Sequence, residues 1–283
     1  MNRFSRLSVG SAFFLSGASA LVYQVAWQRI LALHTGVGIY SVAMIVGAFM
    51  AGLGLGSYVG GLFSTRLGPS RALRAFALLE LGVAAFGAAS VSLYYDVLYL
   101  QAASWYSSPL RAGLLHFVSL LLPTALMGMS LPFLARATYE DAETAGRTVG
   151  FLYGINLLGA SVGALLAPWL LIRYLGVRGA VLVAVAGNLA AAVIALVARP
   201  AAGSDAPEVR FGAPRTAVST EPPRPFALWI ALYALSGFCA LSLEILWFRL
   251  MDVAAKSIAF TFGTMLFLSR LFLFSLSQSG IAP

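Results

Sequence analysis

The chain has 283 residues, of which 60% are hydrophobic and only 10% are charged, and its mean hydropathy is +0.88. Because soluble domains carry about 25% charged residues, a water-soluble globular fold is excluded, and lipid is the expected partner of the outer surface. The net charge of +8 comes from 17 arginines and one lysine scattered singly between apolar runs, so no basic patch for nucleic acid is expected.

Eight segments have the length and composition of membrane-spanning helices. At 1.5 Å per residue, about 20 apolar residues cross the roughly 30 Å of hydrocarbon in a bilayer. The first predicted helix runs from residue 7 to a turn at His34–Gly38. The other seven are predicted at residues 39–64, 72–95, 112–135, 148–172, 179–198, 227–250 and 258–276. The predicted fold class is an all-α integral membrane protein with about eight transmembrane helices.

The N-terminal segment also imitates a secretory signal. Arg3 and Arg6 precede an apolar run, and Ala18-Ser19-Ala20 has the small residues of a cleavage site. However, the apolar run continues through Val25, and the same local pattern recurs deep in the chain, where no signal can lie. We therefore expect an uncleaved first transmembrane helix.

Arginines in the loops predict the orientation. Outside the helices, eleven basic residues fall on one side of the predicted bundle and four on the other. Cytoplasmic loops carry the excess of Lys and Arg, so the richer side is expected to face the cytoplasm. The prediction is a multi-pass protein of the plasma (inner) membrane with its N-terminus and its C-terminal tail in the cytoplasm.

A proline-rich stretch divides the chain. Residues 199–226 contain six of the twelve prolines together with both signs of charge, which is typical of an extended linker. The predicted domains are a six-helix membrane unit at 1–198, a cytoplasmic linker at 199–226, and the first two helices of a second, incomplete unit at 227–283.

An internal repeat supports this division. The segments Leu15–Arg29 and Leu235–Arg249 share seven of fifteen residues at a constant offset of 220. Since both segments lie in helices predicted to start in the cytoplasm, we expect a parallel duplication of a six-helix unit, with the second copy stopping after two helices.

The loop between the second and third predicted helices, Gly61–Arg71, resembles the cytoplasmic loop signature of the major facilitator superfamily. That signature has a glycine, an acidic residue beside an arginine, and a second glycine with basic residues. Here Thr65 takes the acidic position, so the resemblance implies the facilitator-like helix arrangement more than transport. The alternative is a glycine-rich turn with ordinary cytoplasmic arginines.

A second resemblance covers most of the chain. Four segments, Ser16–Arg29, Ala51–Ser57, Leu122–Pro132 and Gly150–Ala160, are similar to the membrane region of fused facilitator-like spermidine synthases. In that family a multi-helix region precedes a Rossmann-like aminopropyltransferase domain. Gln24 stands where the family has Glu, and the chain contains no glycine-rich strand-to-helix turn with an acidic pocket. The resemblance therefore implies a membrane module without catalytic residues, whose aminopropyltransferase domain is missing or separate.

Polar side chains within apolar helices are the candidate functional residues. Ionisable groups at membrane depth are costly and face the bundle interior, a cavity or each other. The candidates for an intramembrane polar site are Gln24, Arg29, Glu80, Asn156, Glu244 and Arg249. Pairing of Glu80 with Arg29 is one hypothesis; the alternative is that Arg29 and Arg249 extend to the outer interface.

Two stripes of glycine at a spacing of four residues mark helix faces that permit close packing. They are Gly52, Gly56, Gly60 and Gly146, Gly150, Gly154. Packing within the bundle is the expected role, and a sliding or dimer surface is the alternative. Several aromatic residues, among them Trp27 and Tyr94, are expected in an outer interfacial belt. No metal site and no cofactor are expected, because neither histidine has a partner at helical spacing.

Three functions follow from these patterns. The first is a membrane module of a spermidine-synthase-like protein, not catalytic by itself. The second is a facilitator-type transporter of a small solute through a polar region near Glu80. The third is an inactive truncated or frameshifted product, because the sequence changes character after Phe267.

Overall fold

The computed structural model describes residues 3–35, 39–101, 104, 106, 108–138, 142–198, 226–255, 264 and 266–271. Within these residues every element of regular secondary structure is a helix, in agreement with the predicted all-α class. The α-helices are α1 (Arg3–Thr35), α2 (Ile39–Ser64), α3 (Pro69–Ser92), α4 (Pro109–Thr138), α5 (Ala142–Leu166), α6 (Arg173–Val197) and α7 (Phe226–Ala255). Two π-helical segments, η1 (Leu93–Gln101) and η3 (Ala167–Ile172), extend α3 and α5.

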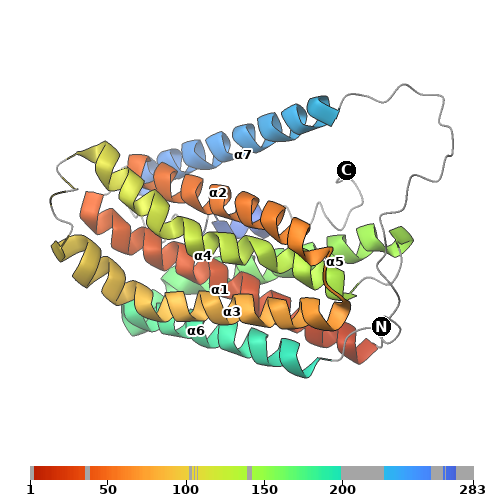
Figure 1. The fold of residues 1–283 in the computed structure, drawn as a ribbon. Coiled ribbons are helices and arrows are strands. Elements are labelled where there is room, and N and C mark those ends of the chain that lie inside the picture. The colour runs from red at the N-terminus through yellow and green to blue at the C-terminus, as the bar shows by residue number, and fades with distance from the viewer. Residues whose placement is uncertain are drawn as a thin grey trace.

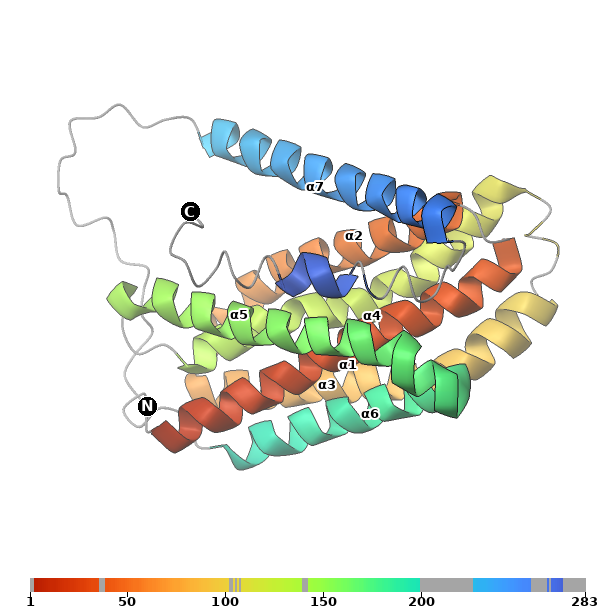
Figure 2. The same cartoon turned by 180° about the vertical axis from the view of Figure 1, so that it is seen from behind.

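Helices α1 to α6 pack side by side, and α7 runs along the outside of this bundle next to α2 (Figures 1 and 2). Helix α1 occupies the middle and contacts α5 and α6, while α3 contacts α4 and α6. The most extensive pairing is between α2 and α4. Four helices, α1, α3, α4 and α6, therefore share one interior.

The third helix is longer than predicted at both ends. It begins at Pro69, where the missing backbone N–H is no loss because the first helical residues have no partner within the helix. Its C-terminal end continues through η1 to Gln101 instead of ending at residue 95. A hydrogen bond joins the loop before α3 to α4: the Arg136 side chain donates its Nε hydrogen to the Leu67 carbonyl at 2.9 Å.

A single glycine separates the last two helices of the bundle. The segment Ala145–Val197 is 53 residues long, far more than the roughly 20 that cross a bilayer. Gly176 interrupts it with φ 71° and ψ 179°, a backbone conformation that side chains with a Cβ rarely adopt. Figure 2 shows α6 running back in the direction opposite to α5, with α1 between the two helices.

Five helical segments of the described residues are long and apolar enough to cross a membrane, and the 53-residue segment contains two helices, α5 and α6. Helix α7 covers the seventh predicted span. Its apolar run among the described residues, Leu228–Cys239, is shorter than the five segments above. The eighth predicted span, 258–276, and the linker at 199–226 fall mainly outside the described residues. The total of eight spans therefore stays a prediction.

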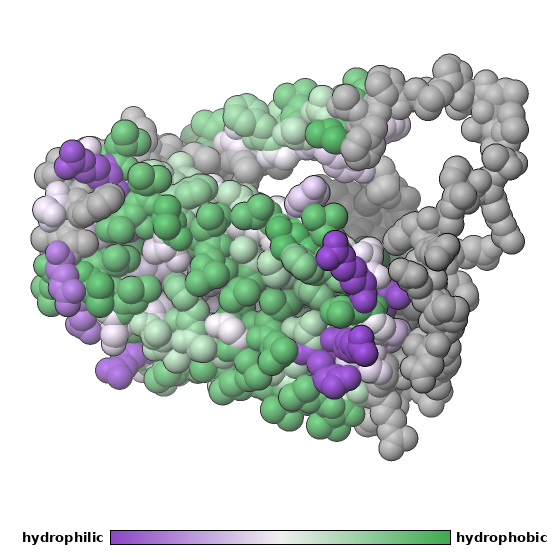
Figure 3. All heavy atoms as spheres, in the orientation of Figure 1, coloured by the Kyte–Doolittle hydropathy of each residue, from purple (hydrophilic) through white to green (hydrophobic). Residues whose placement is uncertain are grey.

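The outer surface of the bundle is apolar. Large side chains such as Leu78, Leu110 and Leu122 are more than half exposed. On the face drawn in Figure 3, hydrophobic residues cover most of the length of the bundle and hydrophilic ones gather toward its two ends. This distribution is the reverse of that in a soluble protein, where long apolar stretches are buried.

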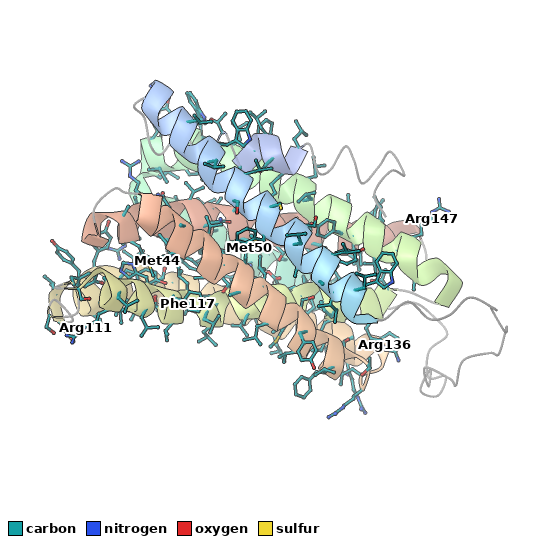
Figure 4. The ribbon with its side chains drawn as sticks, turned by 90° about the horizontal axis from the view of Figure 1, so that it is seen from above. Met44, Met50, Arg111, Phe117, Arg136 and Arg147 are labelled. Atoms are coloured by element: carbon teal, nitrogen blue, oxygen red, sulfur yellow. The ribbon has the colours of Figure 1, made fainter. Side chains whose placement is uncertain are left out.

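The labelled arginines mark both ends of the bundle. In Figure 4, Arg111 lies at one end and Arg136 and Arg147 lie at the other, while Met44 and Phe117 lie between α2 and α4 nearer the Arg111 end. Arg136 and Arg147 belong to the loops predicted to be cytoplasmic, and Arg111 to an opposite loop. Which end faces the cytoplasm stays a prediction.

Candidate functional site: a buried polar centre

Four helices bring one polar side chain each to the same point. The Glu80 carboxylate on α3 is 1% exposed and accepts three hydrogen bonds. Ser16 on α1 donates to Oε1 at 2.7 Å, and Ser130 on α4 donates to the same oxygen at 3.2 Å. Asn188 on α6 donates through Nδ2 to Oε2 at 2.5 Å. We call these four residues the polar centre.

The polar centre lies within the apolar spans, nearer the end of the bundle that holds Thr138 than the opposite end. Ser16 is 9 residues from the start of its apolar span at Leu7, Glu80 is 11 from Pro69, Ser130 is 8 from Thr138, and Asn188 is 9 from Val197. At 1.5 Å per residue these separations are about 12 to 17 Å, half the thickness of a hydrocarbon layer of about 30 Å.

Hydrophobic clusters flank the polar centre on both sides. One cluster, which we call the Phe76 cluster, includes Val9, Phe13, Phe76, Leu134 and Ala191. The other, which we call the Trp27 cluster, includes Leu21, Tyr23, Trp27, Val83, Tyr94, Leu120 and Ala184. Along each of the four helices, the residue of the polar centre stands between a member of one cluster and a member of the other, so apolar side chains separate the centre from both ends of the bundle.

The structure separates the sequence-predicted polar residues. Glu80 belongs to the polar centre, whereas the Arg29 side chain is exposed. Arg29 also lies 13 residues along α1 from Ser16, a rise of about 20 Å. The hypothetical pair between Glu80 and Arg29 is therefore not formed, because the two side chains lie at different depths.

Gln24 and Gln28 are buried on α1, and the Nε2 atom of each has no hydrogen-bond partner among the described residues. Asn156 lies at the contact of α5 with α1, where its Nδ2 donates to the Phe13 carbonyl at 3.1 Å. The backbone of Glu244 and Arg249 belongs to α7, but their side chains lie outside those that the structure describes.

Three residues of the polar centre escaped the sequence-based selection. Ser16 and Ser130 are small hydroxyl residues that helices accept anywhere, and Asn188 sits alone in an apolar run. A usable signal is their common depth: each lies 8 or 9 residues from the same end of the bundle, close to the 11 residues of Glu80. That signal becomes visible only when the pairing of helices is known.

The glycine stripe of α2 lies against α4. A Cβ atom on Gly52 would overlap the Thr124 side chain, and one on Gly56 would overlap the backbone of Ala125. One on Gly60 would lie 2.9 Å from the Cα of Met129. The stripe therefore lets the two backbones approach closely, as small residues do in membrane helices.

The stripe of α5 behaves differently. At Gly146 and Gly150 an added Cβ would meet nothing within 4 Å, so neither is a packing contact among the described residues. The close approach of α5 to α1 occurs further along the helix, where Gly159 faces the backbone of Phe14 and Gly163 that of Ala18. Gly154, the third member of the predicted stripe, is buried on α5.

Two of the aromatic residues expected in the outer belt are in the core. Trp27 and Tyr94 are both 0% exposed. The Trp27 ring stacks on Tyr23 with centroids 4.8 Å apart, and its Nε1 donates to the Ser90 hydroxyl at 2.9 Å. The belt assignment of Trp27 and Tyr94 is wrong, because satisfying the indole N–H and packing the rings inside outweigh the interfacial preference.

No group of three or more His, Cys, Asp or Glu side chains that could hold a metal ion occurs among the described residues. The buried His116 contacts Tyr106, whose hydroxyl lies 3.2 Å from His116 Nε2. Partial burial raises the pKa of Tyr106 above its ordinary value of 10.0. This pair lies near the Arg111 end of the bundle, away from the polar centre.

Comparison with known proteins gives relatives of one kind. The polyamine aminopropyltransferase of Mycobacterium tuberculosis (strain ATCC 25618 / H37Rv) is 31% identical over 184 residues, which are 63% of this chain and 33% of the relative. The polyamine aminopropyltransferase of Corynebacterium efficiens is 30% identical over 188 residues, 65% of this chain and 34% of the relative. Polyamine aminopropyltransferase 2 of Ralstonia nicotianae is 29% identical over 176 residues, which are 62% of this chain and 32% of the relative.

The chain thus spans about a third of the length of the curated relatives it matches. No family model matches the chain, and no solved structure matches it. None of the relatives' names refers to a facilitator, so that part of the predicted resemblance has no support from these comparisons. What the comparisons do support is a link to spermidine-synthase-like proteins, through sequence similarity to polyamine aminopropyltransferases.

Proposed function

We propose that this chain is the helical membrane module of a spermidine-synthase-like protein and has no aminopropyltransferase activity of its own. The observation that carries the proposal is the distribution of polarity. Leucines are exposed along the outside of the bundle, and the carboxylate of Glu80 is enclosed in its interior. Lipid, rather than water, is the solvent that makes this arrangement favourable.

The similarity to polyamine aminopropyltransferases supports the family part of the proposal. The non-catalytic part rests on the glycines. The dense glycine run of the chain lies within α2. Three of these glycines, Gly52, Gly56 and Gly60, pack against α4. A nucleoside-binding turn needs glycines between a strand and a helix. The glycines of α2 are therefore unsuited to hold a nucleoside.

The membrane part is tested by expressing the chain with an N-terminal tag and washing the membrane fraction with alkaline carbonate. We expect the protein to stay in the pellet. A reporter that is active only outside the cytoplasm should be inactive when inserted within 199–226 and active when inserted at 104–108. Recovery in the soluble fraction, or equal reporter activity at both sites, contradicts the proposal. Aminopropyl transfer by the purified chain contradicts the non-catalytic part.

A second candidate function is facilitator-type movement of a small solute, and the enclosed polar centre favours it. Buried ionisable groups inside a helical membrane bundle commonly mark ion or substrate pathways. Uptake of labelled putrescine into vesicles containing the purified chain tests this candidate, since the curated relatives are named for polyamines. Uptake that is lost in Glu80→Gln supports transport, and no uptake above empty vesicles contradicts it for this solute.

A further inference from the structure

The polar centre contains a carboxylate without a positive partner. Among the described residues no basic side chain forms an ion pair with Glu80, and the partner hypothesised from the sequence, Arg29, is exposed at a different depth. Three neutral donors contact the carboxylate, but neutral hydrogen bonds only partly offset the cost of an ionised group in an apolar interior. A positive charge at this point would offset the rest.

The polar centre also contains an unused acceptor. Asn188 is 2% exposed, and its Oδ1 has no hydrogen-bond partner, although the Nδ2 of the same amide touches Glu80. The two ends of an amide are assigned from their hydrogen bonds, and half a turn of the group exchanges them. After that turn, Oδ1 would face the carboxylate of Glu80. Two acceptor oxygens repel each other at this distance unless a cation or a hydrogen lies between them.

All the potential ligands are oxygens. They are the two carboxylate oxygens of Glu80, the hydroxyls of Ser16 and Ser130, and Oδ1 of Asn188. Hydroxyl hydrogens rotate, so each serine can turn from donating to Glu80 to presenting a lone pair. Carboxylate, hydroxyl and amide oxygens are the ligands that hard cations prefer.

Charge and burial select the cation. One carboxylate balances one positive charge, and a divalent ion would leave an uncompensated charge among apolar clusters. All four residues are at most 8% exposed, so an ion bound between them has lost its water shell. The Ser16 and Ser130 hydroxyls lie 2.7 and 3.2 Å from Glu80 Oε1, spacings that suit oxygens held about 2.4 Å from one ion of the radius of Ca²⁺ or Na⁺.

We propose that the polar centre is a binding site for a single Na⁺ ion, held between α1, α3, α4 and α6. The inference deepens the proposed membrane module and rests on it, because the bilayer is what keeps water and counter-ions from Glu80. Since each helix supplies one ligand, bound Na⁺ links the four helices and stabilises the bundle by RT ln(1 + [Na⁺]/Kd).

The test is thermal unfolding of the purified full chain in detergent, in NaCl or in choline chloride at equal ionic strength. We expect the Tm to stay constant at Na⁺ concentrations below the Kd and to rise with the logarithm of the Na⁺ concentration above it, with no rise in choline. Glu80→Gln, which keeps the shape of the side chain, should abolish the rise. Ser130→Ala removes one ligand and should shift the onset of the rise in Tm to a Na⁺ concentration about tenfold higher, and it serves as the test if Glu80→Gln does not fold.

Gln28→Leu is the matched control. Gln28 is as buried as Asn188 and also has an unpartnered polar atom, but it lies 12 residues along α1 from Ser16, a rise of about 18 Å. This variant should keep the Na⁺ response of the wild type. Equal Tm values in NaCl and choline chloride for the wild type overturn the proposal, as does a Tm that depends on pH alone. Failure of the membrane module itself would be seen separately, as protein released by the carbonate wash.

Discussion

Helices α1 and α7 carry similar sequences in opposite surroundings. Seven of fifteen residues are identical at an offset of 220, including the serine, glycine, tryptophan and arginine of the motif. Trp27 on α1 is 0% exposed, whereas Trp247 on α7 is 53% exposed. Gly17 lies against the backbone of Asn156 on α5, whereas an added Cβ on Gly237 would meet nothing within 4 Å.

The difference shows that the motif does not by itself bury a helix. Helix α1 is enclosed because α5 and α6 present glycines and small residues to it, while α7 contacts α2 along the edge of the bundle. The motif is suited to a central helix: its small residues admit neighbours, and its tryptophan fills the space between them. On α7 the same residues face outward wherever the structure describes their side chains.

Replacement of the two tryptophans should give the largest contrast. Trp27→Ala removes a ring that stacks on Tyr23 and contacts Phe86 edge to face, and leaves Ser90 without its donor. We expect it to lower the free energy of unfolding by about 3 to 5 kcal/mol. Trp247→Ala should change it by less than about 0.5 kcal/mol. Reversible unfolding in mixed micelles measures both, and equal losses would show that α7 is enclosed as α1 is.

The two glycines should respond with opposite signs. In Gly17→Ala the new methyl group would overlap the Asn156 backbone, so the helices must separate, and we expect a loss of about 1 to 3 kcal/mol. In Gly237→Ala the methyl group has open space, and the better helix propensity of alanine should add about 0.5 to 1 kcal/mol. The same unfolding assay measures both variants. A gain for Gly17→Ala would contradict the close contact of α1 with α5.

This contrast also defines what the sequence could predict. Hydropathy is a property of each segment, so the all-α class and the approximate positions of α1 to α7 followed from it. The partners of a helix depend on the other helices. The sequence therefore could not place Glu80 between Ser16, Ser130 and Asn188, or exclude Arg29 from that group. The glycine stripe of α5 was misplaced for the same reason: spacing identifies a smooth face, but the facing helix decides whether that face is used.

The serines of the motif should give a smaller contrast. Ser16→Ala removes one of three donors to the buried Glu80 carboxylate, and we expect a loss of about 1 to 2 kcal/mol. Ser236 occupies the equivalent position on α7 and is exposed, so Ser236→Ala should be nearly neutral. If Glu80→Gln is made first, Ser16→Ala should cost less in that background, because a neutral amide binds the hydroxyl more weakly than a carboxylate does. Additive losses would show that Ser16 acts elsewhere than on Glu80.

The smallest effect on stability is expected from moving the cysteine between equivalent positions. Cys239 on α7 is exposed, and the equivalent residue on α1, Ser19, is 4% exposed. A lipophilic maleimide should label the wild type quickly in mild detergent. The double variant Ser19→Cys, Cys239→Ser should react slowly, because its thiol, on α1, would lie against Gly187 of α6. Both proteins should label equally after unfolding in SDS, which controls for the thiol itself. Slow labelling of Cys239 in the folded wild type would mean that its face of α7 is covered, either by residues outside those described or by a second copy, and α7 would then be a packed helix like α1.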